Sequence, residues 1–120
     1  MLRSLEAYRD LILAQPTVIA GDFNTNATWD RVSGSDHSAL VQKLEDLGLV
    51  SAYRAFHGEA HGAETRSTLY FLWRENAPYH IDYCFIPRGW VPLLRGVEAG
   101  AYADWKTLSD HRPRVVDLAL

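Results

Sequence analysis

The chain has 120 residues, the length of one ordinary domain, and a chain of this size buries about two thirds of the surface that it exposes when unfolded. Apolar residues make up 48% and charged residues 22%, close to the globular average, which excludes disordered, collagen-like and coiled-coil chains. The formal net charge of −3 argues against a broad basic surface that grips nucleic acid through its phosphates alone.

The single cysteine, Cys84, excludes an intramolecular disulfide and a multi-cysteine zinc site. Residues 1–15 carry the charges of Arg3, Glu6 and Arg9, and they lack the continuous apolar stretch of a signal peptide or a membrane span. We therefore expect no membrane span and no export, and a reducing, cytoplasmic location is compatible with the lone cysteine.

Helical and strand patterns alternate in the first part of the chain. Apolar residues recur at helical spacing over residues 2–12, which predicts an amphipathic opening helix. The β-branched run Thr17–Ala20 predicts a short strand that is buried on both faces. Ser35 and Asp36 are candidate N-caps of a second helix, which ends at Gly48.

The rest of the chain has the texture of short strands separated by turn residues. The strand-like segments lie around residues 49–56, 67–73, 79–86, 93–99 and 115–120. With no repeat and no linker, the order predicts one α+β domain, mostly antiparallel sheet with two helices packed on one face. A sheet with apolar residues on both faces must bury both, so the other face needs a cover.

Polar residues follow the first predicted strand, and an acidic residue lies within a later one. Gly21-Asp22-Phe23-Asn24 follows the first predicted strand, where α/β architectures gather side chains around a ligand crevice, although these residue types are also ordinary turn formers. Asp82 lies inside the predicted strand 79–86. If that strand is buried, its carboxylate needs a donor or cationic partner such as a histidine; if it is an edge strand, Asp82 lies in water.

Ser109-Asp110-His111 stands immediately before the last predicted strand, and Pro113 restrains the backbone after the histidine. The alternative is an ordinary polar turn. Taken together, the three segments supply acids, an amide and an imidazole, namely Asp22, Asn24, Asp82, Asp110 and His111. This set suits metal-assisted hydrolysis, because carboxylates hold Mg²⁺ and a histidine paired with a carboxylate donates to a phosphate.

The three segments resemble the GDFN, IDY and SDH motifs of the endonuclease/exonuclease/phosphatase superfamily, which has the deoxyribonuclease I-like fold. Here they are Gly21–Asn24, Ile81–Tyr83 and Ser109–His111, in the family's order. The resemblance covers essentially the whole chain and implies the C-terminal half of a four-layer αββα sandwich. It also implies a hydrolase of phosphodiesters or phosphomonoesters that depends on Mg²⁺ or Mn²⁺, with water attacking phosphorus in line.

The resemblance assigns a role to each candidate residue. Asp22 would orient or deprotonate the attacking water, and Asn24 would bind the scissile phosphate. Asp82 would pair with His111, which would stabilise the phosphate or protonate the leaving oxygen. Asp110 would hold the metal together with Asp22. The substrate class stays open, and nucleic acid is possible but not favoured by the net charge.

The chain also departs from the family pattern. Family members are longer, and their N-terminal half supplies the facing sheet and the glutamate that is the chief metal ligand. No glutamate here has that motif context. We therefore expect either a piece of a longer protein or a half-domain that forms a homodimer through its exposed sheet face. The alternative function is such a half-domain without complete catalytic machinery.

The remaining candidates are given structural interpretations. Residues His57–His61 are expected to form a solvated loop, and His37 is expected to cap a helix or lie on the surface. His80 is interpreted as a hydrogen-bonded strand histidine, and Cys84 as a small buried hydrophobic residue. Residues Ser67–Tyr70 resemble the family's strand ahead of IDY, which approaches the phosphate.

Overall fold

The computed structural model describes residues 2–30 and 37–120, so the predicted caps Ser35 and Asp36 lie outside the described residues. The helices are α1 (Leu2–Ala7), α2 (Arg9–Ala14), α3 (His37–Asp46), α4 (Ala52–His57) and α5 (Tyr102–Trp105). Three 3₁₀ segments join them, η1 (Ala27–Trp29), η2 (Phe71–Trp73) and η3 (Arg88–Leu93). Of the helices described, none has both the length and the apolar character to cross a bilayer.

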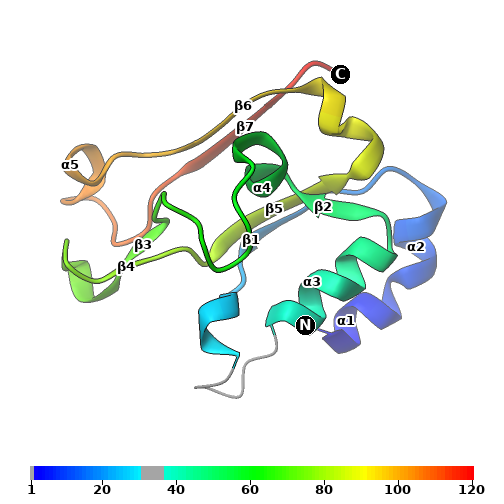
Figure 1. Ribbon diagram of the computed structural model, residues 1–120, viewed down its shortest axis with the longest axis horizontal. Coiled ribbons are helices and arrows are strands. Elements are labelled where there is room, and N and C mark those ends of the chain that lie inside the picture. The colour runs from blue at the N-terminus through cyan, green and yellow to red at the C-terminus, as the bar shows by residue number, and fades with distance from the viewer. Residues whose placement is uncertain (1, 31–36) are drawn as a thin grey trace.

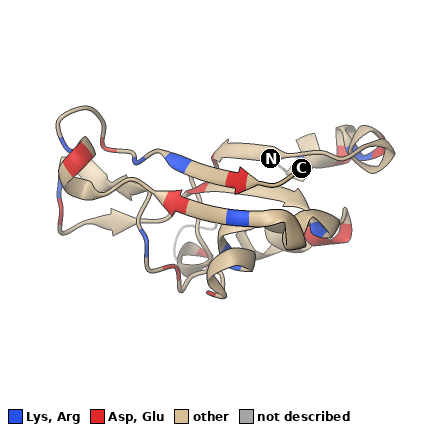
Figure 2. Ribbon diagram, turned by 90° about the horizontal axis from the view of Figure 1, so that it is seen from above, with Lys and Arg blue, Asp and Glu red and all other residues tan. Residues whose placement is uncertain are grey.

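The strands form three antiparallel sheets (Figure 1). The first has the order β1-β5-β2, with β1 (Ile19–Asp22), β5 (Asp82–Pro87) and β2 (Leu49–Ser51). The other two are the pairs β3 (Leu69–Tyr70) with β4 (Pro78–Tyr79), and β6 (Leu94–Ala99) with β7 (Arg114–Leu118). Figure 2 shows β6 and β7 side by side, each with a basic and an acidic residue. The predicted α+β class with antiparallel sheets is confirmed.

The first hydrophobic cluster joins the helices to one face of the central sheet. Tyr83 and Phe85 alternate onto this face of β5, where α1, α2 and α3 cover them. The buried members are Leu5, Ile12, Leu40, Val41, Leu44, Leu47, Leu49, Tyr83 and Phe85. Each large apolar side chain buried here contributes about 1.5–3 kcal/mol. The predicted helices on one face are therefore present, with the opening helix divided at Tyr8 into α1 and α2.

A second cluster lies between α4, β5 and the β6–β7 pair. Its buried members are Ala52, Tyr53, Ile86 and Val97. Cys84 packs against this cluster, as its interpretation as a hydrophobic residue requires, but it is only half-buried. Burial raises the pKa of its thiol.

Three predicted strands differ from the structure. Segment 79–86 is divided into the end of β4 and most of β5, because His80 and Ile81 belong to neither strand. Segment 49–56 is a strand only over β2, after which the Ser51 Oγ accepts the Arg54 N–H at 3.3 Å and starts α4. Gly58 ends that helix with a left-handed φ of 71°. Segment 67–73 is likewise a strand only over β3, because the chain turns into η2. Local capping overrides the strand pattern in segment 49–56.

The prediction that the first strand is buried on both faces is wrong. Within the described residues β1 pairs only with β5, and Ala20, Gly21 and Asp22 are exposed. Beside it α1 and α2 leave an apolar groove of about 460 Å³, partly lined by Tyr8 and Leu11. A strand is buried on both faces only if other elements pack on each face, and the described residues do not bury Ala20, Gly21 and Asp22 of β1.

The interpretations of His37 and of the loop after α4 are also corrected. His37 is fully buried, and its Nε2 lies 3.5 Å from Nδ1 of His61. Its side chain does not cap α3; the carboxylate of Asp30 accepts the His37 N–H at 2.7 Å instead. The loop is not simply solvated, because Glu59 accepts the Tyr53 hydroxyl at 2.5 Å and also bonds Thr65.

Candidate active site

The central sheet places two carboxylates next to each other. In the register of β1 against β5, Asp22 stands directly opposite Asp82. Directly opposed residues of an antiparallel pair have Cβ atoms about 4.5–5.5 Å apart, and like charges in that position repel. β5 is the middle strand of its sheet, so the alternative of Asp82 on an edge strand in water is wrong. A nearby cation or hydrogen-bond donor would therefore stabilise the two adjacent carboxylates.

His111 is the group that lies against both carboxylates. A bridge between Leu69 and His111 fixes its main chain next to β3. Its Nδ1 is 2.9 Å from Asp82 Oδ2, and its Nε2 is 3.8 Å from Asp22 Oδ2. Among the described residues, Asp22, Asp82 and His111 are the group of three potential metal ligands whose ligand atoms all lie within 4.8 Å of one another.

The hydrogen bond to Asp82 determines how His111 is oriented. A carboxylate only accepts, so the shared proton belongs to Nδ1, and Nε2 is left toward Asp22. Partial burial alone would lower the pKa of His111. The hydrogen bond and charge of Asp82, together with the charges of Asp22 and Asp110, outweigh burial and raise that pKa above its usual value. The protonated imidazole is thus favoured.

Asn24 holds the first carboxylate through a tight turn. Its backbone N–H donates to Asp22 Oδ1 at 2.8 Å, while the residue itself has a left-handed φ of 51°. Asparagine tolerates that conformation better than most residues do. The turn fixes Oδ1 of Asp22, and Asn24 itself is exposed.

Asp110 lies beside this group without belonging to it. Its carbonyl accepts the N–H of Tyr70 at 2.8 Å, and its charge contributes to the raised pKa of His111. The structure therefore brings together Asp22, Asp82 and His111, with Asn24 on the turn and Asp110 at the edge.

Thr68 ties the two motif segments together, a role that sequence reasoning missed. Its Oγ1 accepts the N–H groups of Ile81 at 3.0 Å and Asp82 at 3.1 Å. Its carbonyl accepts the N–H of Arg112 at 2.7 Å, so one fully buried residue links the strand of Asp82 to the segment of His111. A threonine in the strand ahead of IDY was the available signal, but its partners are distant in sequence.

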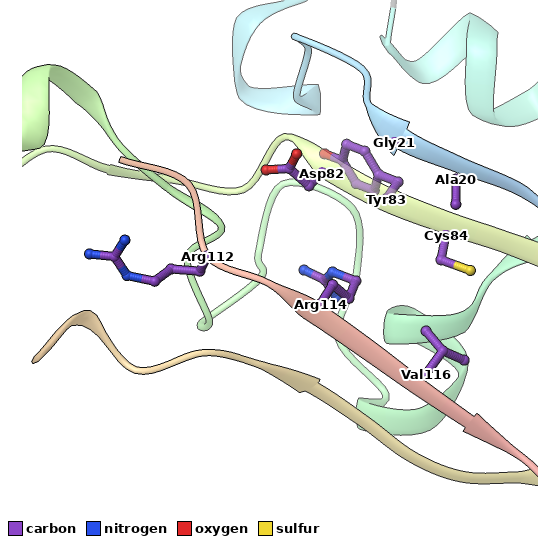
Figure 3. A pocket seen from close by; sticks show the side chains of 8 residues that line it. All are labelled: Ala20, Gly21, Asp82, Tyr83, Cys84, Arg112, Arg114 and Val116. Atoms are coloured by element: carbon purple, nitrogen blue, oxygen red, sulfur yellow. The ribbon is translucent and has the colours of Figure 1, made fainter. Parts of the chain in front are cut away.

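A pocket of about 350 Å³ adjoins the site on the side of β7 (Figure 3). Cys84 and Val116 lie at one end of it, and Asp82 and Arg114 at the other, while the side chain of Arg112 extends away. A cavity of this size has room for several waters. Burial lowers the pKa of Arg114, against the opposing charge of Asp82 among others.

His80 is hydrogen-bonded, as its interpretation required, but it lies between β4 and β5 and not within a strand. The residue is buried, and its Nδ1 donates to the carbonyl of Arg66 at 2.8 Å. Its Nε2 lies 3.2 Å from the guanidinium of Arg114, which can only donate. Burial first, and then the charge of Arg114, lower its pKa to about 4, so the ring is neutral at pH 7.

The donor set of the site fits a hard divalent cation. Oxygen ligands are what Mg²⁺ prefers, and carboxylates suit Mn²⁺ as well. The side chain of Asp22 is 36% exposed and that of Asp82 is 20% exposed, so an ion has access from the Asp22 side. One oxygen of Asp82 is already engaged by His111, which leaves Asp22 as the more available ligand.

Comparison with known families gives a match that spans most of the chain. A family model described as the endonuclease/exonuclease/phosphatase family matches residues 2–111, a range that includes all three motif segments. No curated protein matches the chain. The family match confirms the resemblance of the three motif segments to this family.

Proposed function

The chain belongs to the endonuclease/exonuclease/phosphatase family, and on that premise we propose that it is a metal-dependent phosphoester hydrolase with Asp22, Asp82 and His111 as its catalytic group. The observation that carries the proposal is the placement of His111 between two carboxylates that come from separate motifs. A surface histidine without such partners would have neither a fixed orientation nor a raised pKa.

His111 is proposed as the proton donor. Its Nδ1–H is held by Asp82, so Nε2 is the atom free to donate to a phosphate oxygen or to the leaving oxygen. The raised pKa favours the doubly protonated ring, in which Nε2 also carries a proton. A positioned general acid of this kind contributes about 10²- to 10⁴-fold to a rate.

Asp22 is proposed to act on the attacking water, and Asn24 is proposed to bind the substrate phosphate. Asp22, with one oxygen held by the Asn24 N–H, orients or deprotonates the water. The exposed amide of Asn24 binds the scissile phosphate. The water oxygen forms the new bond to phosphorus in line as the bond to the leaving oxygen breaks, and His111 supplies the proton that this oxygen takes up.

Asp22 would hold the Mg²⁺ or Mn²⁺ ion, with Asp110 at the edge of the site as a further ligand. When bound, the cation supplies charge that stabilises the phosphoryl oxygens in the transition state. Substrates are phosphodiesters or phosphomonoesters. Nucleic acid is the less favoured class, because the chain has a net charge of −3.

The test is hydrolysis of an activated phosphodiester by the purified chain in Mg²⁺ or Mn²⁺ and in EDTA. We expect turnover that EDTA abolishes and that falls by about 10² or more in His111→Ala. His57→Ala is the matched control, because His57 lies at the end of α4 and bonds the carbonyl of Val97. Wild-type turnover no higher than that of His111→Ala would contradict the proposal.

A second candidate is a half-domain without complete machinery that forms a homodimer. The exposed strand β1 and the apolar groove beside it favour this candidate, because unprotected edges and apolar surface promote association. Sedimentation of the wild type and of Leu11→Asp tests it. A dimer that the exposed Leu11 substitution dissociates supports this candidate, and a monomer at all concentrations contradicts it.

A further inference from the structure

Arg112 follows His111 directly and is only 3% exposed. Its guanidinium carbon lies 4.7 Å from the ring centroid of Tyr70 and 5.1 Å from that of Tyr102. The two rings meet edge to face at 4.7 Å, so β3, α5 and the residue after the catalytic histidine pack as one unit. Cation–π contacts are stronger in a desolvated place of this kind than at an exposed surface.

The hydrogen bonds of this guanidinium within the described chain end on three main-chain carbonyls, two of which belong to the turn that carries His111. Nη1 donates to Ser109 O at 2.8 Å and to His111 O at 2.9 Å, which are the two ends of the same short turn. Nη2 donates to Tyr102 O at 3.3 Å. Inside the turn, Ser109 Oγ accepts the His111 N–H at 3.0 Å. The rigid planar guanidinium holds its donors in fixed directions, which a flexible lysine ammonium does not.

A buried charge is costly unless its bonds repay the loss of hydration. Here two of the three carbonyl partners, those of Ser109 and His111, belong to the histidine's own turn, where they restrain the direction of its side chain. The backbone N–H of Arg112 adds to this restraint through its bond to Thr68, which also holds Asp82. The segment is thus fixed on both sides of the point from which the imidazole projects.

We propose that Arg112 is a positioning residue, whose guanidinium fixes the turn Ser109–His111 so that the imidazole Nδ1 stays within hydrogen-bond distance of Asp82. This rests on the proposed function of the site in one respect only, the effect on turnover. The geometric part of the proposal concerns the bond between His111 and Asp82, whatever the substrate.

Without the guanidinium, the carbonyls of Ser109 and His111 lose a hydrogen-bond donor and the turn relaxes. Residues that orient a functional group from behind change activity by about 10- to 100-fold when they are replaced. Because a misdirected proton donor weakens the transition state more than substrate binding, the loss falls on kcat and leaves KM nearly unchanged.

The test compares Arg112→Met and Arg112→Lys with the wild type. Methionine keeps apolar bulk, and lysine keeps the charge but replaces the planar guanidinium with a single ammonium group. Tyr102→Phe is the matched control, since it keeps both the ring and the main-chain carbonyl. Folding is followed by circular dichroism. The bond itself is followed by the proton resonance of His111 Nδ1–H, which a purely structural role would leave in place.

We expect both Arg112 variants to fold, to lose or shift the Nδ1–H resonance, and to lose about 10- to 100-fold in kcat, with Tyr102→Phe unchanged. Folded variants that retain the wild-type resonance would overturn the proposal. Failure of both variants to fold would also overturn it, since Arg112 would then be required for stability and not for positioning. If the Arg112 variants lose or shift the Nδ1–H resonance while the wild type shows no turnover, the positioning role stands and only the proposed activity is refuted.

Discussion

Acidification from pH 7 to pH 5 is expected to destabilise the protein through two histidines, the buried His80 and the partly buried His61. Burial is the largest cause that lowers the pKa of His80 to about 4 and that of His61 to about 4, from a usual value of 6.5. Between 6.5 and 4 the unfolded chain binds protons at both rings while the folded chain does not. Stability therefore falls as the pH falls through this window, and these two groups cause no further loss below it.

The size of the effect follows from the two pKa values. One proton of difference between the unfolded and folded chain is worth about 1.4 kcal/mol per pH unit. Integrated from pH 7 to pH 5, the two rings together remove roughly 3–4 kcal/mol. The buried His37 adds in the same direction. His111 opposes them, because its raised pKa makes its proton uptake stabilise the folded state as the pH falls.

Urea unfolding at pH 7, 6 and 5 and constant ionic strength measures this loss. His61→Gln removes one of the two titrating rings and should flatten the dependence by about half, or roughly 2 kcal/mol over the same range. Desolvation raises the pKa of Glu59, but hydrogen bonds from Thr65 and Tyr53 outweigh it and lower the pKa to about 2, so this carboxylate takes up protons in the unfolded chain mainly below the range measured. A free energy of unfolding that is constant or higher at pH 5 would refute the reasoning.

Three further outcomes follow from the packing and the site. Leu44→Ala, in the centre of the first cluster, should lower the free energy of unfolding by about 2–5 kcal/mol, and a loss under 1 kcal/mol in urea unfolding would contradict the assigned core. Gly58→Ala should cost about 1 kcal/mol by the same measurement, because φ is 71° there, and no loss would argue against the left-handed cap. Asp82→Asn should lower the pKa of His111 in an NMR titration, since it removes the carboxylate hydrogen bond; an unchanged pKa would be the opposing result.

The convergence of Asp22, Asp82 and His111 could be anticipated because each lies in a motif at a strand end or within a strand. The pairing of Asp22 with Asp82 follows from an antiparallel register that the motifs alone do not state. Thr68 could not be assigned its role, because its bonds join main-chain groups that are far apart in sequence. The same applies to the carbonyls bound by Arg112.

Other elements could not be resolved for local reasons. The short apolar run 49–56 fits a strand or a helix, and only the caps Ser51 and Gly58 decide in favour of α4. His37 was misplaced because its burial depends on Tyr83, whose ring lies 5.0 Å away but belongs to another part of the chain. The exposure of β1 was missed because an apolar strand indicates burial without showing what covers it.

A double-mutant cycle on phosphodiester turnover tests the central claim most directly, that Asp82 and His111 act as one catalytic unit. It compares the wild type with Asp82→Asn, His111→Ala and the double variant in the presence of Mg²⁺. Residues that work as a unit show strongly non-additive losses. We predict that the double variant is about as slow as His111→Ala alone. Losses that multiply, or a wild type without metal-dependent turnover, would contradict the account.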